Sequence, residues 1–271
     1  MNELLTIQNK IIVITGATGV LGSAMARYLA SEGAEVVLLA RNGTKAEALQ
    51  QDIQKNGGKA LALKADVTQE SDLEAVRQQL QEAYGKVDVL INAAGGNMPG
   101  ATITPDQSLL DSDVNALRQI IELNYIGTYL PTKVLLPLFL QEKTGSIINI
   151  SSMSADRPLT RVMGYSSSKA AIDNLTKWLA VEFAQKYGEG LRVNAIAPGF
   201  FLTVQNKTLL TKQDGELTDR GQQIIANTPM QRFGRPEELF GAVHYLSSNA
   251  ANFVTGTIMA VDGGFGAYSG V

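Results

Sequence analysis

Residues 11–22 read IIVITGATGVLG, and this stretch decides the class of fold. Its first four residues are apolar and β-branched, which is typical of a strand buried on both faces of a parallel sheet. Gly16, Gly19 and Gly22 then permit a tight turn, and the residues beyond have helical spacing as far as about Glu32. The stretch therefore predicts the strand–turn–helix unit with which a doubly wound α/β fold opens.

The same alternation of short apolar runs and longer helical patterns continues along the chain. Further strands are predicted at residues 36–39, 60–65, 87–91, 146–150, 191–197 and 257–261, and further helices at 44–56, 71–84, 113–142, 164–186 and 236–248. Parallel neighbours need crossover connections. This order therefore predicts an α/β, doubly wound Rossmann-type fold with a seven-stranded parallel sheet.

Length and rhythm predict the domain organisation. The 271 residues contain no internal repeat and no low-complexity tract, so we expect residues 1–271 to form a single domain. Residues 200–235 interrupt the alternation of strands and helices. An excursion of that length often covers an active site, and we expect a substrate lid there.

Composition excludes several classes of function. A formal net charge of −3 argues against a protein that holds nucleic acid by neutralising phosphates. No apolar run is long enough for a membrane span or a signal peptide, so a cytoplasmic protein is expected. The chain has no cysteine, and His244 is its only histidine. Thiolate and multi-histidine metal sites are therefore excluded, and we expect no metal.

The glycine turn between the first strand and the first helix has the chemistry of a phosphate site. Glycines let the backbone approach a pyrophosphate, and the N-terminus of the helix offers unpaired N–H groups and a partial positive charge. Placed directly after a buried strand, the turn predicts a dinucleotide site in a binding and catalytic domain. The expected cofactor contacts are Gly16, Thr18, Gly19, Val20, Leu21 and Gly22.

The end of the second strand bears on the choice between NAD and NADP. NAD enzymes often carry an acidic residue there for the ribose 2′-hydroxyl, whereas an arginine suits the 2′-phosphate of NADP. The chain has Arg41 and Asn42 and no carboxylate. This favours NADP(H), with NAD(H) as the alternative. Arg41 could also be an ordinary solvated loop cation.

Tyr165 and Lys169 lie four residues apart in a predicted helix and therefore share one of its faces. A free tyrosine titrates near pH 10, and a neighbouring ammonium favours its phenolate form. The pair is a candidate acid–base site. Two such residues occur at this spacing by chance in many helices. The surrounding motifs therefore decide whether the pair is interpreted as catalytic.

Those motifs make the sequence resemble the short-chain dehydrogenase/reductase family. They match in order and spacing from Lys10 to Gly264, and they are Thr15 to Gly22, Asn92 to Gly95, Asn124, Ser151-Ser152, the Tyr165/Lys169 pair and Pro198-Gly199. The protein is identified as a member of the shorter branch of this family. The resemblance implies hydride transfer between a nicotinamide ring and a carbonyl/alcohol pair.

The resemblance also implies a catalytic set of Asn124, Ser152, Tyr165 and Lys169. Tyr165 would protonate the carbonyl oxygen during reduction. Lys169 would lower the pKa of the tyrosine and bind the nicotinamide ribose. Ser152 would hydrogen-bond the substrate oxygen, and Asn124 would hold the water of a proton relay.

Further cofactor contacts are implied at the ends of other strands. They are Asp66 and Val67 at the adenine, Asn92, Ala93, Ala94 and Gly95 along the cleft, and Pro198, Gly199 and Thr203 at the nicotinamide end, in addition to Tyr165 and Lys169. Two positions depart from the family pattern. Val20 stands where glycine is usual, which puts the pyrophosphate geometry in question. Ala93 stands where asparagine is common, which we consider minor.

Three residues in the loops near the expected site are candidates for substrate contact: Asn97, Arg157 and Arg161. Guanidinium groups bind carboxylates well, so an acidic sugar or a hydroxy acid is indicated. Arginines that are solvated or make subunit contacts are the alternative.

The excursion after Phe200 and the loop at Gly95 to Asn97 resemble those of a bacterial subgroup of the family, the D-mannonate oxidoreductases (fructuronate reductases). This implies interconversion of D-fructuronate and D-mannonate. An enzyme like gluconate 5-dehydrogenase, a 3-oxoacyl carrier-protein reductase, and a non-catalytic dinucleotide sensor are the alternatives. The family further implies a homo-oligomer, tetramer or dimer, with a small-molecule substrate.

Overall fold

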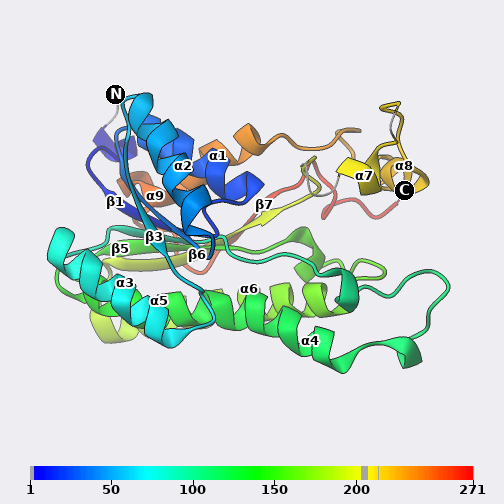
Figure 1. Cartoon of the computed structure of the whole chain (residues 1–271), viewed down its shortest axis with the longest axis horizontal. Coiled ribbons are helices and arrows are strands. Elements are labelled where there is room, and N and C mark those ends of the chain that lie inside the picture. The colour runs from blue at the N-terminus through cyan, green and yellow to red at the C-terminus, as the bar shows by residue number, and fades with distance from the viewer. Residues whose placement is uncertain (1–2, 203–206, 213, 271) are drawn as a thin grey trace.

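The computed structural model describes residues 3–202, 207–212 and 214–270. At its centre is a parallel sheet with the strand order β3-β2-β1-β4-β5-β6-β7 (Figure 1). The strands are β1 (Ile11–Thr15), β2 (Glu35–Ala40), β3 (Lys59–Lys64), β4 (Val89–Asn92), β5 (Gly145–Ile150), β6 (Leu191–Pro198) and β7 (Ile258–Val261). The predicted doubly wound Rossmann-type fold is confirmed. The strand order reverses between β1 and β4, where such folds bind their ligands.

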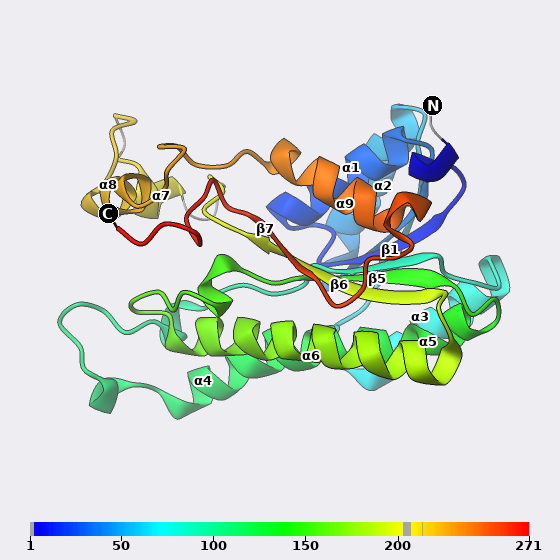
Figure 2. The same cartoon turned by 180° about the vertical axis from the view of Figure 1, so that it is seen from behind.

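Helices cover both faces of the sheet (Figure 1, Figure 2). One layer contains α1 (Val20–Ser31), α2 (Gly43–Lys55) and α9 (Phe240–Ser247), and the other contains α3 (Glu70–Ala83), α5 (Gly127–Leu140) and α6 (Met163–Tyr187). Ile12 and Ile14 of β1 belong to the first core, whereas Ile11 and Val13 belong to the second. Successive side chains of a strand point to opposite faces, so burial on both faces explains why β1 is apolar throughout.

The single helix predicted at residues 113–142 is interrupted in the structure. It consists of α4 (Val114–Ile121), one turn of π-helix over Glu122–Ile126, and α5. Within the π-helical turn, the Asn124 side-chain nitrogen donates to the carbonyl oxygen of Ile120 at 2.8 Å. A side chain that bonds to a backbone carbonyl in this way interrupts the regular ladder.

The excursion at residues 200–235 contains two short helices, α7 (Lys207–Leu210) and α8 (Asp219–Ala226). A bridge between Phe201 and Gly234 joins its two ends. The C-terminal segment returns beside α8 (Figure 2). Among the described residues, no helix has the length and apolar character that a membrane crossing requires.

Candidate active site

The carboxyl ends of the central strands position the candidate residues. Thr15 ends β1, Asn92 ends β4 and Ile150 ends β5, and the registers of these strands place the three residues along the same edge of the sheet. The edge lies at the point where the strand order reverses. Loops that leave it converge on the crevice in which open α/β sheets bind ligands.

Helix α6 delivers Tyr165 and Lys169 to this edge. The Lys169 Nζ atom lies 5.6 Å from the centroid of the Tyr165 ring and donates a hydrogen bond to the carbonyl oxygen of Ile150 at 2.7 Å. Lys169 is only 4% exposed. Burial lowers the pKa of Lys169 to about 8, although the charge of Asp173, one turn further along α6, opposes this effect. The lysine is thus held beside the tyrosine, with a pKa below that of a free lysine.

Burial also acts on Tyr165. It raises the pKa of the Tyr165 phenol above its ordinary value, and the hydroxyl of Ser152 partly offsets the rise. Ser152 is itself buried, and its Oγ atom accepts hydrogen bonds from the Ser154 nitrogen at 3.2 Å and the Ser154 hydroxyl at 3.0 Å. The protein alone therefore favours the protonated phenol, the form that can donate to a carbonyl oxygen.

Asn124 is fully buried, and its side chain is held on both sides. Besides its bond to Ile120, its Nδ2 atom donates to the carbonyl oxygen of Gly96 at 2.9 Å, and its Oδ1 atom accepts from the Gly96 nitrogen at 3.0 Å. Gly95 fits closely between two candidate residues. A Cβ atom there would lie 2.7 Å from Asn124 Oδ1 and 3.4 Å from Lys169 Nζ. The structure thus brings Asn124, Ser152, Tyr165 and Lys169 to one edge of the sheet.

The glycine turn after β1 has the shape that a phosphate group requires. Gly16 has a φ of +64°, and a Cβ atom there would meet the Ala94 backbone at 2.7 Å. A Cβ atom on Gly22 would lie 2.4 Å from the carbonyl oxygen of Gly16. Helix α1 then begins at Val20 without a hydrogen bond from any capping side chain. An uncapped helix N-terminus behind closely packed glycines fits a dinucleotide pyrophosphate. Thr18, Val20 and Leu21 are half-buried in the same turn.

The next loop of the edge is fixed to this turn. The backbone nitrogens of Ala93 and Ala94 both donate to the Thr15 hydroxyl at 3.1 Å. The Asn92 side chain is directed into the protein, where its Nδ2 atom donates to Asn149 at 2.9 Å and to Thr132 at 3.0 Å. The four-residue stretch from Asn92 to Gly95 therefore forms a wall between the glycine turn and Lys169.

Arg41 and Asn42 directly follow β2. Arg41 is exposed, and the Asn42 side-chain oxygen accepts from the Lys45 nitrogen at 3.0 Å, which caps helix α2. At the end of the neighbouring strand β3, the Asp66 carboxylate accepts from the nitrogen and hydroxyl of Thr68, and Val67 is buried. No carboxylate forms a salt bridge with Arg41 among the described residues.

At the far end of the crevice, β6 ends at Pro198. The Gly199 nitrogen donates to the Val261 carbonyl oxygen at 2.9 Å, and a Cβ atom on Gly199 would lie 2.6 Å from the Cα atom of Asp262. The last expected contact, Thr203, lies outside the described residues.

The three substrate candidates lie in different surroundings. The Asn97 side-chain nitrogen donates to the Thr102 hydroxyl at 2.9 Å, within its own loop. An Arg157 guanidinium nitrogen donates to the carbonyl oxygen of Tyr268, in the C-terminal segment, at 3.4 Å. Arg161 is exposed near Arg220 of helix α8. Sequence analysis did not single out Arg220, because no local pattern indicates that α8 packs near this loop.

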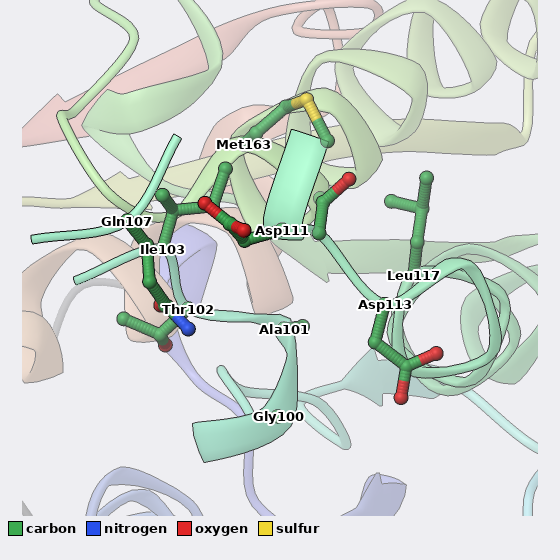
Figure 3. Close-up of a pocket in the computed structure, with 11 residues that line it drawn as sticks. Gly100, Ala101, Thr102, Ile103, Gln107, Asp111, Asp113, Leu117 and Met163 are labelled. Carbon is green, nitrogen blue, oxygen red and sulfur yellow. The ribbon is translucent and has the colours of Figure 1, made fainter. Parts of the chain in front are cut away.

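Two cavities are lined by none of the four candidate catalytic residues. One of about 50 Å³ lies between residues 100–113 and the start of α6 (Figure 3). The other, of about 450 Å³, lies between α8 and the C-terminal segment, and Gln222, Ile225 and Tyr268 contribute to its lining. The first has room for only one or two water molecules. Among the described residues, no group of three potential metal ligands gathers anywhere.

Known proteins are similar in sequence over nearly the whole chain. A family model described as enoyl-(acyl carrier protein) reductase matches residues 16–266. The uncharacterized oxidoreductase UxuB of Bacillus subtilis (strain 168) is 46% identical over 271 residues, which cover 97% of this chain and 96% of that protein.

Solved structures are also similar. A Haemophilus influenzae protein, assigned provisionally as a D-mannonate oxidoreductase and bound to NAD, is 44% identical with a TM-score of 0.92 and 98% coverage of each chain. A gluconate 5-dehydrogenase from Burkholderia cenocepacia J2315, in complex with NADP and tartrate, is 27% identical with a TM-score of 0.86 and 98% coverage of each chain.

The family match and these relatives agree with the motifs and with the arrangement of the strands. The chain therefore belongs to the short-chain dehydrogenase/reductase family and is an NAD(P)-dependent oxidoreductase that acts on carbonyl and alcohol groups.

Proposed function

We propose that the enzyme reduces the ketone of D-fructuronate to the secondary alcohol of D-mannonate, or catalyses the reverse oxidation. The observation that carries the proposal is the convergence of Asn124, Ser152, Tyr165 and Lys169 beside a loop with an arginine, Arg161. The 44% identity to the provisionally assigned D-mannonate oxidoreductase supports the same substrate.

The protein's own residues supply the acid–base chemistry. Tyr165, protonated at neutral pH, donates its hydroxyl proton to the carbonyl oxygen while a hydride arrives at the carbon. Ser152 hydrogen-bonds the same oxygen and orients it. Lys169 binds the nicotinamide ribose, and its charge favours the phenolate left on Tyr165 after the transfer. Asn124, fixed by Gly96, positions the water that returns the proton.

The cofactor supplies the hydride, and three parts of the protein would hold it. The glycine turn from Gly16 to Gly22 would hold the pyrophosphate, and Asp66 and Val67 would contact the adenine. The loop from Asn92 to Gly95, together with Pro198 and Gly199, would hold the nicotinamide end, and Thr203 is proposed as a further contact there. Arg41, which is exposed and forms no salt bridge with any described residue, favours NADP(H) over NAD(H). The Haemophilus influenzae structure holds NAD, so this preference requires its own test.

We further propose that residues 1–271 act as a single dinucleotide-binding and catalytic domain with a lid at residues 200–235. Asn97 and Arg157 would then contact the substrate from the loops beneath the lid. Trp178 and Val181 of α6, each 58% exposed, give an apolar face that supports a homo-oligomer, tetramer or dimer. We also propose a cytoplasmic location for this enzyme.

A gluconate 5-dehydrogenase activity is the second candidate. The similarity to the Burkholderia cenocepacia enzyme, whose structure holds a tartrate, favours it. The substrates of both candidate activities are acids that contain a ketone. The loops around the crevice, and not the catalytic set, must therefore distinguish them.

The decisive assay follows the near-ultraviolet absorbance of the reduced cofactor. D-Fructuronate and 5-keto-D-gluconate are each supplied with NADPH and, separately, with NADH. Oxidation of NADPH that depends on D-fructuronate, with D-mannonate as the product, is the expected result. Turnover of 5-keto-D-gluconate alone would replace the first candidate with the second. If neither acid is reduced by enzyme that binds the cofactor, both sugar-acid assignments are wrong.

A further inference from the structure

Arg220 contacts the loop that contains Arg161, close enough for the charge of one guanidinium to act on the other. Arg161 belongs to the loop that leads into α6, and Arg220 belongs to the first turn of α8. An Arg220 guanidinium nitrogen donates to the Thr160 hydroxyl at 3.4 Å. The nitrogen of Ile103 in turn donates to the Arg161 carbonyl oxygen at 2.9 Å. Three separate segments of the protein therefore meet at this point.

The two charges have no counterion within the described part of the protein. The arginines Arg27, Arg232 and Arg235 form salt bridges, whereas neither Arg161 nor Arg220 does. Arg220 is half-buried. Burial, followed by the charge of Arg161, lowers the pKa of the Arg220 guanidinium. Removing a cation from water beside a second cation is unfavourable, and an anion bound between them would reverse the sign of the interaction.

The backbone of Arg161 is also unusual. Its φ of +74° lies in the left-handed region, which a non-glycine residue with a long side chain seldom adopts. Such residues persist where the surrounding structure fixes them, and they gather at ligand-binding sites. The hydrogen bond from Ile103 supplies the constraint here.

The location suits a substrate that also reaches Tyr165. Arg161 precedes Tyr165 by four residues, and α6 begins between them at Met163. On α8, Gln222 lines the cavity against the C-terminal segment. Arg220 lies about 200° from Gln222 around the helix, so it belongs to the other side of α8. This side contacts the loop beside the catalytic tyrosine.

We propose that Arg161 and Arg220 together bind the carboxylate of the substrate, and that the bound acid holds α8 against the loop before α6. This inference deepens the proposed function and rests on it. Arg157 lies outside this pair, since its guanidinium already donates to the C-terminal backbone. Two planar guanidinium groups can bind one carboxylate through parallel N–H···O bonds, which a neutral sugar cannot accept with equal strength.

Calorimetric binding tests the proposal without turnover. The full-length enzyme is saturated with NADPH and titrated with D-mannonate or with D-mannitol, which carries a primary alcohol in place of the carboxylate. No hydride transfer can follow, since both cofactor and ligand are reduced. We expect Arg161→Gln and Arg220→Gln each to weaken D-mannonate binding about 10- to 100-fold, with D-mannitol binding unchanged. Arg220→Lys keeps the charge and should retain part of the affinity.

The matched control is Arg118→Gln on α4, because Arg118 is exposed and bonds only to Asn115 among the described residues. It should bind D-mannonate like the wild type. Wild-type affinity for D-mannonate in Arg220→Gln would overturn the proposal, as would equal wild-type affinities for the acid and the alcohol. An equal loss of NADPH binding would assign the arginines to a cofactor phosphate and also overturn it.

Failure of this subsite and failure of the proposed function give different results. If the wild type reduces D-fructuronate and both variants keep its KM, the subsite is wrong and the function stands. If the wild type does not reduce D-fructuronate but binds D-gluconate in a way that requires both arginines, the substrate assignment is wrong and the carboxylate subsite stands.

Discussion

The edge of the sheet and the excursion beside it are built in opposite ways. At the edge, polar side chains are buried and bonded to the backbone, as Asn124 is to Gly96 and Lys169 is to Ile150. In the excursion and the loops that face it, Arg157, Arg161 and Arg220 are exposed or half-buried. Among the described residues, the guanidinium groups of Arg157 and Arg220 form only long hydrogen bonds of 3.4 Å, and that of Arg161 forms none. The comparison indicates a rigid part that performs chemistry and an open part that selects the substrate.

The largest effect is expected at the rigid edge. Tyr165→Phe removes only the hydroxyl that donates the proton, so kcat should fall by about 10²- to 10⁴-fold while cofactor affinity and the melting temperature stay at wild-type values. Steady-state kinetics together with fluorescence titration of NADPH measure both. Wild-type turnover in this variant would contradict the assigned role of Tyr165.

The next largest effect is expected at Asn124. Asn124→Ala leaves the nitrogen of Gly96 and the carbonyl oxygen of Ile120 without their partners. The free energy of unfolding should fall by about 1–3 kcal/mol in urea denaturation, and activity should fall with it. The exposed Asn115, replaced by alanine, is the control. Equal unfolding midpoints for the two variants would show that the π-helical turn does not depend on Asn124.

Arg41 tests the cofactor end of the same edge. In Arg41→Ala, the ratio of kcat/KM for NADPH to that for NADH should fall by about tenfold. The 2′-phosphate of NADPH loses its counterion, whereas the 2′-hydroxyl of NADH carries no charge and is unaffected. The two cofactors are compared at one substrate concentration, with Arg27→Ala as the control. An unchanged ratio would identify Arg41 as a solvated cation and remove the basis for the NADP preference.

A smaller effect concerns pH. Asp173 raises the pKa of Lys169, which burial lowers to about 8, so its removal should lower that pKa further. If catalysis requires charged Lys169, the alkaline limb of the pH–rate profile in Asp173→Asn should move to lower pH, by about 0.5 to 1 pH unit. The control is Asp52→Asn, since Asp52 pairs with Arg27 far from the site. A limb that moves to higher pH would contradict the proposal that Asp173 raises the pKa of Lys169.

The smallest effect is expected at Val20, where the sequence departs from the family. Val20 is the first residue of α1, a position with ordinary helical geometry, whereas Gly16 and Gly22 are the glycines that leave no room for a Cβ atom. Val20→Gly should therefore change the KM for the cofactor by less than about threefold. Gly22→Ala, by contrast, should weaken cofactor binding severely, and equal effects in the two variants would contradict this interpretation of the turn.

The residues of the rigid edge were predictable from the sequence, whereas the contacts made by the open part were not. Each central strand is buried on both faces and therefore appears as a run such as Ile11 to Ile14. Tyr165 and Lys169 share a helix, so their spacing alone places them together. These features depend on neighbours in the sequence or on the order of strands.

Other features depend on contacts between distant segments. Asn124, in the π-helical turn, bonds to Gly96 from another loop, and Arg220 lies near Arg161 only after the excursion folds beside α6. Burial also determines that Lys169 has a lowered pKa, which residue spacing cannot indicate. Local patterns carry no signal for any of the three.

The most direct test of the account compares D-fructuronate with D-fructose, which differs by a primary alcohol in place of the carboxylate. Initial rates are measured with NADPH for the wild type and for Tyr165→Phe. We expect rapid NADPH oxidation by the wild type with the acid, much slower oxidation with the neutral ketose, and almost none in the variant. Equal rates with the two ketoses, or no reaction with the acid, would contradict the assignment of a sugar-acid reductase.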